Sequence, residues 1–319
     1  MMSIDALIGH SGFVGGTLSR QHAFAAHFNT SNIDAIVGRE FDTLICAAAP
    51  GSMFTANREP ERDREQIEAL IERLDGVSAR RFVLISSIAV LADFAAGDDE
   101  STQAFQKDLP YGRHRRALEA FCETRFENFL VVRLPALFGS GLRKNFIFDL
   151  LNPVPTMLTR ARLEMLLGQL PPALRDALVQ LYAPDMTGMY TVNREALNSS
   201  SFRPELESAV RAAGMSATQF HNPGTTYQYY DLSRLWCDIG IATKFALRHL
   251  HLATEPLLTC DIHSRLLGTE MPSSDARRHR EDMHTRHAAL WGRESHYLED
   301  AGTLLNSLAA FFLAHRRAA

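Results

Sequence analysis

The sequence predicts an α/β fold, in which helices cover both faces of a parallel β-sheet and a smaller, mostly helical lobe completes the chain. Two observations lead to this class. Apolar runs alternate with helical patterns across residues 3–134, which is typical of parallel sheets built from crossover units. A glycine-rich turn at 9–15 joins the first of those runs to the first helix. Hydrophobic residues make up 46% of the 319 residues, which suffices for a large core and two lobes.

The elements of the first half follow from the spacing of apolar residues. Runs of apolar and β-branched residues predict strands at 3–8, 24–29, 41–49, 82–87 and 129–134. Helical periodicity predicts helices at 13–23, 58–74 and 110–124. The segment between the second and third strands is too short for a full helix–strand unit, so we expect that half of the sheet to be compact.

After the last of these strands the pattern changes. Residues 146–185 are helical in pattern and punctuated by prolines, and a strand–helix rhythm returns at 227–253. We therefore expect a nucleotide-binding domain at 1–150 that also recruits about 226–255, and a substrate-binding lobe with C-terminal helices at 151–319.

A run of mixed charge at 276–287 is expected to be the solvated face of a helix. Its histidines, His279, His284 and His287, lack the i, i+4 spacing of a metal-binding helix. We therefore expect no metal.

Composition excludes several classes of function. The net charge is −4 and the pI about 6.4, which gives no attraction to nucleic acid or to an anionic membrane. No apolar run approaches the roughly 20 residues of a membrane-spanning helix. Asp5 interrupts the one candidate for a secretion signal. We expect a cytoplasmic protein with four scattered, buried thiols, at Cys46, Cys122, Cys237 and Cys260.

The glycine turn has the features of a dinucleotide site. It follows a strand and opens a helix, and that context matters because three glycines alone are a weak signal. Gly9 permits the tight turn, Gly12 lets the backbone approach a pyrophosphate, and Gly15 allows close packing of helix on strand. The helix N-terminus would stabilise the phosphate charge. The alternative is a purely structural turn.

A second motif lies downstream, where Ser86-Ser87 is followed by Tyr111 and, four residues later, by Arg115. With the GxxGxxG spacing and the alanines that end the third strand, it resembles the extended short-chain dehydrogenase/reductases. That family includes the NAD-dependent epimerases and dehydratases of nucleotide sugars. The compact first half and Glu59-Pro60 are similar to its dTDP-4-dehydrorhamnose reductase branch. The resemblance implies a Rossmann-type sheet.

The resemblance also implies roles for particular residues. Tyr111 would be the acid or base, Ser87 would hydrogen-bond the substrate oxygen, and Arg115 would stand where the family has a lysine. The cofactor would be NAD or NADP, since no carboxylate closes the second strand before Asp34. The residues expected to contact it are Gly9, Ser11, Gly12, Phe13, Val14, Gly15, Asn29, Ser31, Ala47, Ala48, Ala49, Tyr111, Arg115 and Pro135.

The tyrosine–arginine pair makes chemical sense for proton transfer. A tyrosine pKa near 10 must fall by about three pKa units, roughly 4 kcal/mol, for the phenol to be half ionised at neutral pH. A cation one helical turn away favours that shift. Arginine, however, cannot pass a proton onward. His114 is a candidate substitute, although a solvated surface histidine is the simpler expectation.

The sequence thus predicts an NAD(P)-dependent oxidoreductase or epimerase/dehydratase that acts on a sugar nucleotide or a related carbonyl or alcohol compound. One alternative is a non-catalytic NAD(P)-binding sensor or scaffold, which Arg115 favours, as does Ala136 where family members usually carry asparagine. Another is a reductase of a small non-sugar ketone. A homodimer is one option for assembly.

Overall fold

The computed structural model describes residues 4–185 and 187–316, and the chain divides into two compact units. Unit 1 comprises the residues up to Leu142 together with Tyr227–Leu257 and Arg280–Ser307. Unit 2 comprises Arg143–Thr226, Leu258–His279 and the residues from Leu308 onward. Within the described ranges, no helix combines the length and apolar character that crossing a membrane requires.

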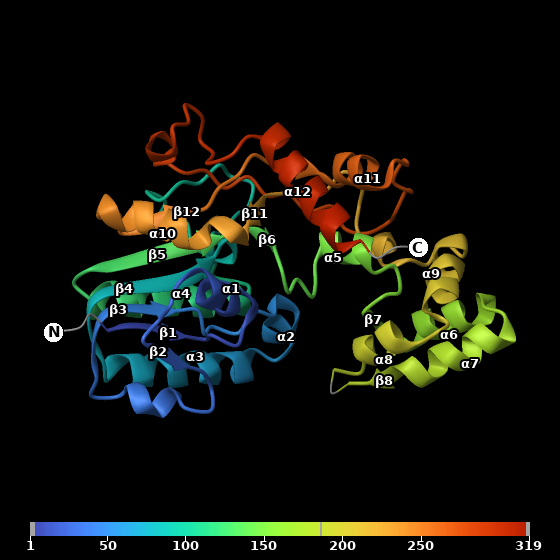
Figure 1. The fold of residues 1–319 in the computed structure, drawn as a ribbon, viewed down its shortest axis with the longest axis horizontal. Coiled ribbons are helices and arrows are strands. Elements are labelled where there is room, and N and C mark those ends of the chain that lie inside the picture. The colour runs from blue at the N-terminus through green and yellow to red at the C-terminus, as the bar shows by residue number, and fades with distance from the viewer. Residues whose placement is uncertain (1–3, 186, 317–319) are drawn as a thin grey trace. The chain divides into compact units, whose positions relative to one another are not determined.

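Unit 1 is built on a six-stranded sheet whose neighbouring strands all run parallel, which confirms the predicted fold class (Figure 1). The strand order is β12-β5-β4-β3-β1-β2. The strands are β1 (Asp5–Ile8), β2 (Ala26–Phe28), β3 (Glu40–Cys46), β4 (Ser78–Ser87), β5 (Phe129–Leu134) and β12 (His249–His251).

Helices cover both faces of this sheet because its strands are apolar on both sides. Successive side chains of a strand point to opposite faces, so Ile8 joins one core cluster and Leu7 the other. The first cluster packs under α3 (Pro60–Asp75) and α4 (Pro110–Arg125). The second packs under α1 (Phe13–Gln21) and α10 (Leu235–Lys244).

The connection between β2 and β3 is short, as the sequence predicted. It contains one 3-10 turn, η1 (Ile33–Ile36), and β2 is therefore the edge strand beside β1. The other elements of unit 1 are α2 (Met53–Arg58), η2 (Ile88–Val90), β6 (Ala136–Phe138), β11 (Tyr229–Asp231), η4 (Leu232–Arg234) and η5 (Ala288–Trp291). β6 and β11 pair in parallel.

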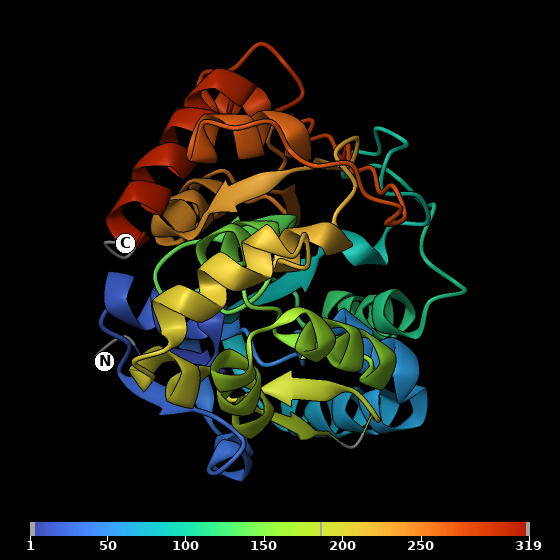
Figure 2. The ribbon, with the colours of Figure 1, turned by 90° about the vertical axis from the view of Figure 1, so that its right-hand side faces the viewer.

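Unit 2 is mostly helical, and its core gathers leucines from several short helices around a small antiparallel sheet of order β7-β9-β8 (Figure 2). Its elements are α5 (Phe146–Leu151), β7 (Met157–Leu158), α6 (Arg160–Gln169), α7 (Pro172–Leu181), β8 (Tyr182–Pro184), β9 (Tyr190–Val192), α8 (Arg194–Ser199), α9 (Arg203–Ala212), η3 (Ala217–Phe220) and α11 (Thr259–Leu267). Three further elements, β10 (Thr226–Tyr227), β13 (Leu257–Leu258) and α12 (Ala301–His315), span positions where the chain passes from one unit to the other.

The predicted helix at 276–287 is wrong. That segment contains no helix, and several of its backbone bonds go to the loop at 94–98. Asp282 N donates to Phe94 O, Gly97 N donates to Asp282 O, and His284 N donates to Asp98 O. Charge alternation along a sequence does not reveal such long-range pairing.

The thiols also differ in part from the expectation. Cys46 and Cys122 are buried, but Cys237 is exposed and Cys260 is half-buried, and all four are free. Cys237 belongs to α10, whose other face carries the apolar residues that pack on the sheet.

Candidate active site at the carboxyl edge of the sheet

The glycine turn after β1 has a backbone that only small residues permit. Gly9 adopts a φ of +90°, and a Cβ atom there would collide with the carbonyl of Ala47. A Cβ atom at Gly15 would collide with the carbonyl of Gly9. Gly12 is the N-cap of α1 and offers no capping side chain, so the backbone N–H groups of the first helical turn remain available to an anion.

The predicted cofactor residues lie along one edge of the sheet, in the order of its strands. Parallel strands end at the same edge, so the loops after them are neighbours. From β5 to β2, the residues at this edge are Pro135 after β5, Ser87 as the last residue of β4, Ala47–Ala49 after β3, Gly9–Gly15 after β1 and Asn29–Ser31 after β2. Ser11 is exposed, Phe13 and Val14 are half-buried, and Ala47, Ala48 and Ala49 are half-buried.

Tyr111 is placed by the start of α4. Pro110 occupies the first turn of that helix, where its missing N–H costs nothing. The backbone N–H of Tyr111 donates to Asn57 Oδ1 of α2 at 2.9 Å. Gly112 lets α4 approach η2 so closely that a Cβ atom would collide with the Ala89 carbonyl. The start of α4 is therefore fixed against both α2 and the end of β4.

A narrow recess opens beside Tyr111, with about 140 Å³ of empty space. Its lining is apolar apart from Asn57 and the phenol, and it includes Met53, Phe94 and Leu109. Pockets that enclose a whole drug-sized ligand are several times larger. That space consists of gaps between side chains and open solvent, and it is too tight for a water molecule, so the recess in this structure admits no substrate group beside the phenol.

Ser87 ends β4 and faces the same phenol. Its Oγ accepts a hydrogen bond from Ala89 N at 3.2 Å, which caps η2. A side-chain hydrogen bond between Ser87 and Tyr111 favours the ionised phenol and lowers the Tyr111 pKa. The structure thus brings together the two side chains that the motif predicted.

Arg115 lies one turn along α4 and is only 2% exposed. Its Cζ stands 3.9 Å above the centre of the Tyr111 ring, which is a cation–π contact. Nη2 donates to Pro50 O, just after the alanines that follow β3. Nη1 donates to Asp63 Oδ2 and, at 3.3 Å, to Tyr111 O. Nε is buried and has no hydrogen-bond partner among the described residues.

His114 is not the solvated surface histidine that the sequence suggested. It is 6% exposed, and its Nδ1 lies 2.8 Å from Asp63 Oδ2. Asp63, on α3, is itself only 4% exposed and so accepts from two residues of α4. The reason is the packing of α3 on α4, which turns this face of α4 toward a carboxylate rather than toward solvent.

The electrostatics of Tyr111 also differ from the expectation of a lowered pKa. Burial is the largest influence and raises the pKa of the phenol above its ordinary value of 10. The Arg115 charge lowers it, as predicted, but the Asp63 charge raises it again. Tyr111 is therefore a protonated phenol at neutral pH.

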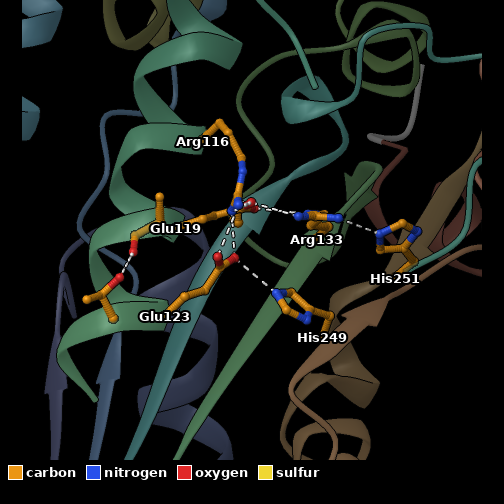
Figure 3. Close-up of polar contacts among 9 residues, drawn as sticks. Arg116, Glu119, Glu123, Arg133, His249 and His251 are labelled. Carbon is orange, nitrogen blue, oxygen red and sulfur yellow. Dashed lines mark hydrogen bonds and ion pairs between the residues drawn. The ribbon is translucent and has the colours of Figure 1, made fainter. Parts of the chain in front are cut away.

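A second buried network lies on the same helix (Figure 3). Glu119 of α4 accepts from Arg133 of β5 through two bonds, at 3.0 and 2.8 Å, and from Ser86 Oγ at 2.6 Å. Arg133 Nη1 donates to His251 Nε2 of β12 at 2.9 Å. This network ties α4 to the strand that ends in Ser87, so it holds the two halves of the motif in register.

The loop after β2 is closed by its own side chains. Asn29 Oδ1 accepts from Ser31 N and Ser31 Oγ, at 2.9 and 2.6 Å. Asn32 Oδ1 accepts from Asn29 N at 2.8 Å. Asp34, the first carboxylate after this strand, pairs instead with Arg73 of α3 at 2.7 Å.

Sequence reasoning missed Asp63, Asn57 and Pro50. A signal for Asp63 was present, because it precedes Ile67, Leu70 and Leu74 at helical spacing and therefore falls on the apolar face of α3. A charged residue at such a position needs a buried partner. Asn57 and Pro50 act on α4 across the fold, and no local pattern marks them.

Comparisons with known proteins find similarity at the level of the fold and none at the level of sequence families. No protein-family model matches the sequence, and no curated protein matches it. RMD from Pseudomonas aeruginosa, complexed with NADPH, is 16% identical with a TM-score of 0.60, over 98% of this chain and 99% of that one. dTDP-4-dehydrorhamnose reductase from Bacillus anthracis, in complex with NADP, is 13% identical with a TM-score of 0.60, over 98% and 99%.

UDP-glucose 4-epimerase from Thermotoga maritima, with UDP-glucose, is 12% identical with a TM-score of 0.57, over 98% of both chains. At these identities a likeness establishes architecture and leaves chemistry to be argued from the site. The chain has the fold of the extended short-chain dehydrogenase/reductases, as its motifs predicted.

Proposed function

We propose that this protein is an NAD(P)-dependent oxidoreductase or epimerase of the extended short-chain type. The observation that carries the proposal is the row of loops along the carboxyl edge of the sheet. There a turn that tolerates no side chain at Gly9 or Gly15 and a helix N-terminus without a capping side chain share one edge with Ser87, Tyr111 and Arg115. The solved structures of the same fold contain NADPH, NADP or NAD, which supports the same cofactor class here.

The residues present fit a dinucleotide. Gly9 and Gly15 let the turn pack closely against the protein's own backbone, and Gly12, the N-cap, keeps the start of α1 free of a side chain. The N-terminal N–H groups of α1 would then face a pyrophosphate. When bound, the nicotinamide ring supplies or accepts the hydride. The end of β2 has no carboxylate to repel a 2′-phosphate, because Asp34 is paired with Arg73. We therefore expect NADP to be accepted at least as well as NAD.

Tyr111 and Ser87 would handle the proton. In the reductive direction the carbonyl carbon of the substrate gains a hydride and its π electron pair moves to oxygen. That oxygen takes the Tyr111 proton while Ser87 hydrogen-bonds it. The hydride would come from the reduced dinucleotide held at the glycine turn, and the proton comes from Tyr111. Because the phenol is protonated at neutral pH, its resting form suits this direction.

The substrate class is proposed from two sources. Solved structures of this fold hold UDP-glucose or UDP-glucuronic acid, so a sugar nucleotide is the first candidate. The second source is the Ser87–Tyr111 motif, which resembles that of the nucleotide-sugar enzymes. The recess at Tyr111 is too tight in this structure to admit a substrate group and gives no information on the substrate. We also expect a cytoplasmic location and a homodimer.

A second candidate function is favoured by one observation. Each terminal nitrogen of the Arg115 guanidinium is engaged by protein atoms, and arginine relays no protons. A chain of this kind can bind a dinucleotide without turning a substrate over. This sensor or scaffold alternative predicts tight dinucleotide binding and no turnover with any sugar nucleotide or small ketone.

The test is Tyr111→Phe. The substitution keeps the ring under Arg115 and removes only the hydroxyl, so we expect turnover to fall about 10²–10⁴-fold, the usual contribution of a general acid. NADPH affinity, measured by fluorescence titration, should change by less than a few-fold. The control is Glu68→Gln, at an exposed position of α3, and it should leave both turnover and NADPH affinity unchanged.

Near-normal turnover in Tyr111→Phe would remove Tyr111 from the mechanism. Failure of the wild-type chain to bind either NADP or NAD would end the proposal as a whole. Binding without turnover in the wild-type chain, across a panel of sugar nucleotides and ketones, would favour the second candidate.

A further inference from the structure

We propose that Asp63 is a positioning residue of the candidate site: it holds the Arg115 guanidinium over the Tyr111 ring and offsets the charge that this guanidinium presents to the phenol. The proposal rests on the proposed function, because it assigns a role within the same site. It goes beyond the Ser–Tyr–Arg motif, which contains no carboxylate.

Asp63 is a charged residue at a position where a helix normally carries an apolar side chain. It is on the buried face of α3, in line with Ile67, Leu70 and Leu74, and is 4% exposed. A buried carboxylate without partners is strongly unfavourable. Its partners here are Arg115 and His114, both on α4 and both buried. The carboxylate is therefore built into the contact between the two helices.

The bonds of Arg115 fix the plane of its guanidinium. Nη2 is held by Pro50 O and Nη1 by Asp63 and Tyr111 O, so the two terminal nitrogens are held in two directions. This plane is the one that faces the Tyr111 ring at 3.9 Å. A lysine in the same place has one nitrogen and no plane to orient. Asp63 thus provides an anchor that the replacement of lysine by arginine requires.

The same carboxylate sets the charge that the phenol experiences. The charged groups that act on Tyr111 are Arg115 from α4 and Asp63 from α3, and their effects on its ionisation are opposite. The other elements against it present neutral groups, namely Asn57 of α2 and Ser87 at the end of β4. His114 faces Asp63. Asp63 therefore opposes the effect of the Arg115 charge on the Tyr111 pKa, in the same direction as burial.

The experiment is a spectrophotometric titration of Tyr111 in the whole chain. Phenolate absorbance is followed against pH for Asp63→Asn, and the curve of the same variant carrying Tyr111→Phe is subtracted, because the chain has seven tyrosines. Asparagine keeps the shape of the side chain and removes its charge. The Tyr111 midpoint should move to lower pH than in the wild-type chain. Far-UV circular dichroism at each pH limits the comparison to folded protein.

The matched control is Glu68→Gln on the same helix. Glu68 pairs with Arg64 at 2.8 Å, but both side chains are about half exposed, so its charge is screened from the site. Its Tyr111 midpoint should equal that of the wild-type chain. An unchanged or higher midpoint in Asp63→Asn overturns the proposal, and so does an equal shift in the control.

A second measurement needs no substitution at Asp63. In wild-type chain labelled with ¹⁵N-arginine, the Arg115 guanidinium signal is assigned by its loss in Arg115→Lys. A guanidinium held at both terminal nitrogens should show separate, slowly exchanging Nη resonances. A single averaged Nη signal would show that the group rotates freely and that no carboxylate holds it, which also overturns the proposal.

Neither measurement contains a dinucleotide or a substrate. Asp63 can therefore fail both tests in a chain that binds NADP and turns over a substrate. It can equally pass both in a chain that binds no cofactor. The two outcomes separate this proposal from the proposed function.

Discussion

Helix α4 takes part in two buried arginine–carboxylate pairs that differ in their hydrogen bonds. Arg115 of α4 pairs with Asp63 of α3, and one turn later Glu119 of α4 pairs with Arg133 of β5. All four side chains are nearly inaccessible to solvent. The second pair is bidentate, whereas the first meets through a single carboxylate oxygen.

The pairs differ in how completely their polar atoms are satisfied. Every guanidinium nitrogen of Arg133 has a partner, two in Glu119 and one in His251. Arg115 leaves Nε buried and without a partner, and its face covers a phenol. Fully satisfied networks specify structure, while incompletely satisfied ones concentrate at functional sites. The comparison favours a structural role for Arg133 and is consistent with the proposed role of Arg115 in the site.

The largest expected effect compares the two carboxylates. Glu119→Gln leaves Arg133 buried without its counter-ion and disturbs bonds to Ser86 and Arg116, so we expect a loss of about 3–5 kcal/mol in the free energy of unfolding. Asp63→Asn removes a carboxylate with fewer partners and should cost less, about 2–3 kcal/mol. Urea unfolding at pH 7.5 measures both.

The ranking is the informative result. If Asp63→Asn destabilises the chain as much as Glu119→Gln does, the first pair is as structural as the second. The distinction between an architectural and a chemical arginine would then be lost. Equal slopes of the two urea transitions are required for the comparison, since a changed slope signals a changed unfolded state.

An intermediate effect is expected when each arginine becomes lysine. Arg133→Lys loses the bidentate bond and the contact to His251, and should cost about 2–3 kcal/mol. Arg115→Lys keeps a cation beside Tyr111 but has one nitrogen in place of the two that reach Asp63 and Pro50 O, and should cost about 1–2 kcal/mol in the free energy of unfolding. Turnover in Arg115→Lys should be retained or raised.

A collapse of turnover in Arg115→Lys, with the fold intact by circular dichroism, would show that the site is built around a guanidinium. If Arg115→Lys lowered the free energy of unfolding by more than Arg133→Lys does, Arg115 would be the more structural of the two arginines. Thermal unfolding and a turnover assay on the same preparations decide both points.

Much of the row of loops at the sheet edge could be predicted from the sequence. Gly9 and Ser87 stand at the ends of apolar strands, and parallel strands of one sheet end together. The short connection after β2 was likewise visible as a missing helix–strand unit. These features are local in the chain, so spacing alone locates them.

The partners of the charged residues could not be predicted in the same way. Asp63 and Arg115 are 52 residues apart, and Glu119 and Arg133 are 14 apart. Which carboxylate meets which guanidinium depends on how α3 and α4 pack and on which strand residues face them. The balance between Arg115, Asp63 and burial, which leaves the Tyr111 pKa raised, depends on the same packing.

The smallest expected effect uses pH to probe the fully satisfied network. His251 Nε2 accepts from Arg133, and Nδ1 donates to His284 O at 2.8 Å, so the ring is neutral. Burial lowers the pKa of His251 below its ordinary 6.5, Arg133 acts in the same direction, and Glu100 and Glu119 oppose them. Below pH 6.5 the unfolded chain therefore binds a proton that the folded chain refuses.

Stability from this group is complete above pH 6.5 and is lost as pH falls toward the lowered folded pKa, by at most about 1.4 kcal/mol per pH unit. His251→Gln supplies one acceptor for Arg133 and one donor for His284 O but does not titrate. Urea unfolding at pH 8 and pH 5 should show a larger acid loss in the wild-type chain than in this variant. If both chains lose the same stability between pH 8 and pH 5, then protonation of His251 does not destabilise the network around Arg133. The hydrogen bond between His251 and Arg133 would then contribute little to stability.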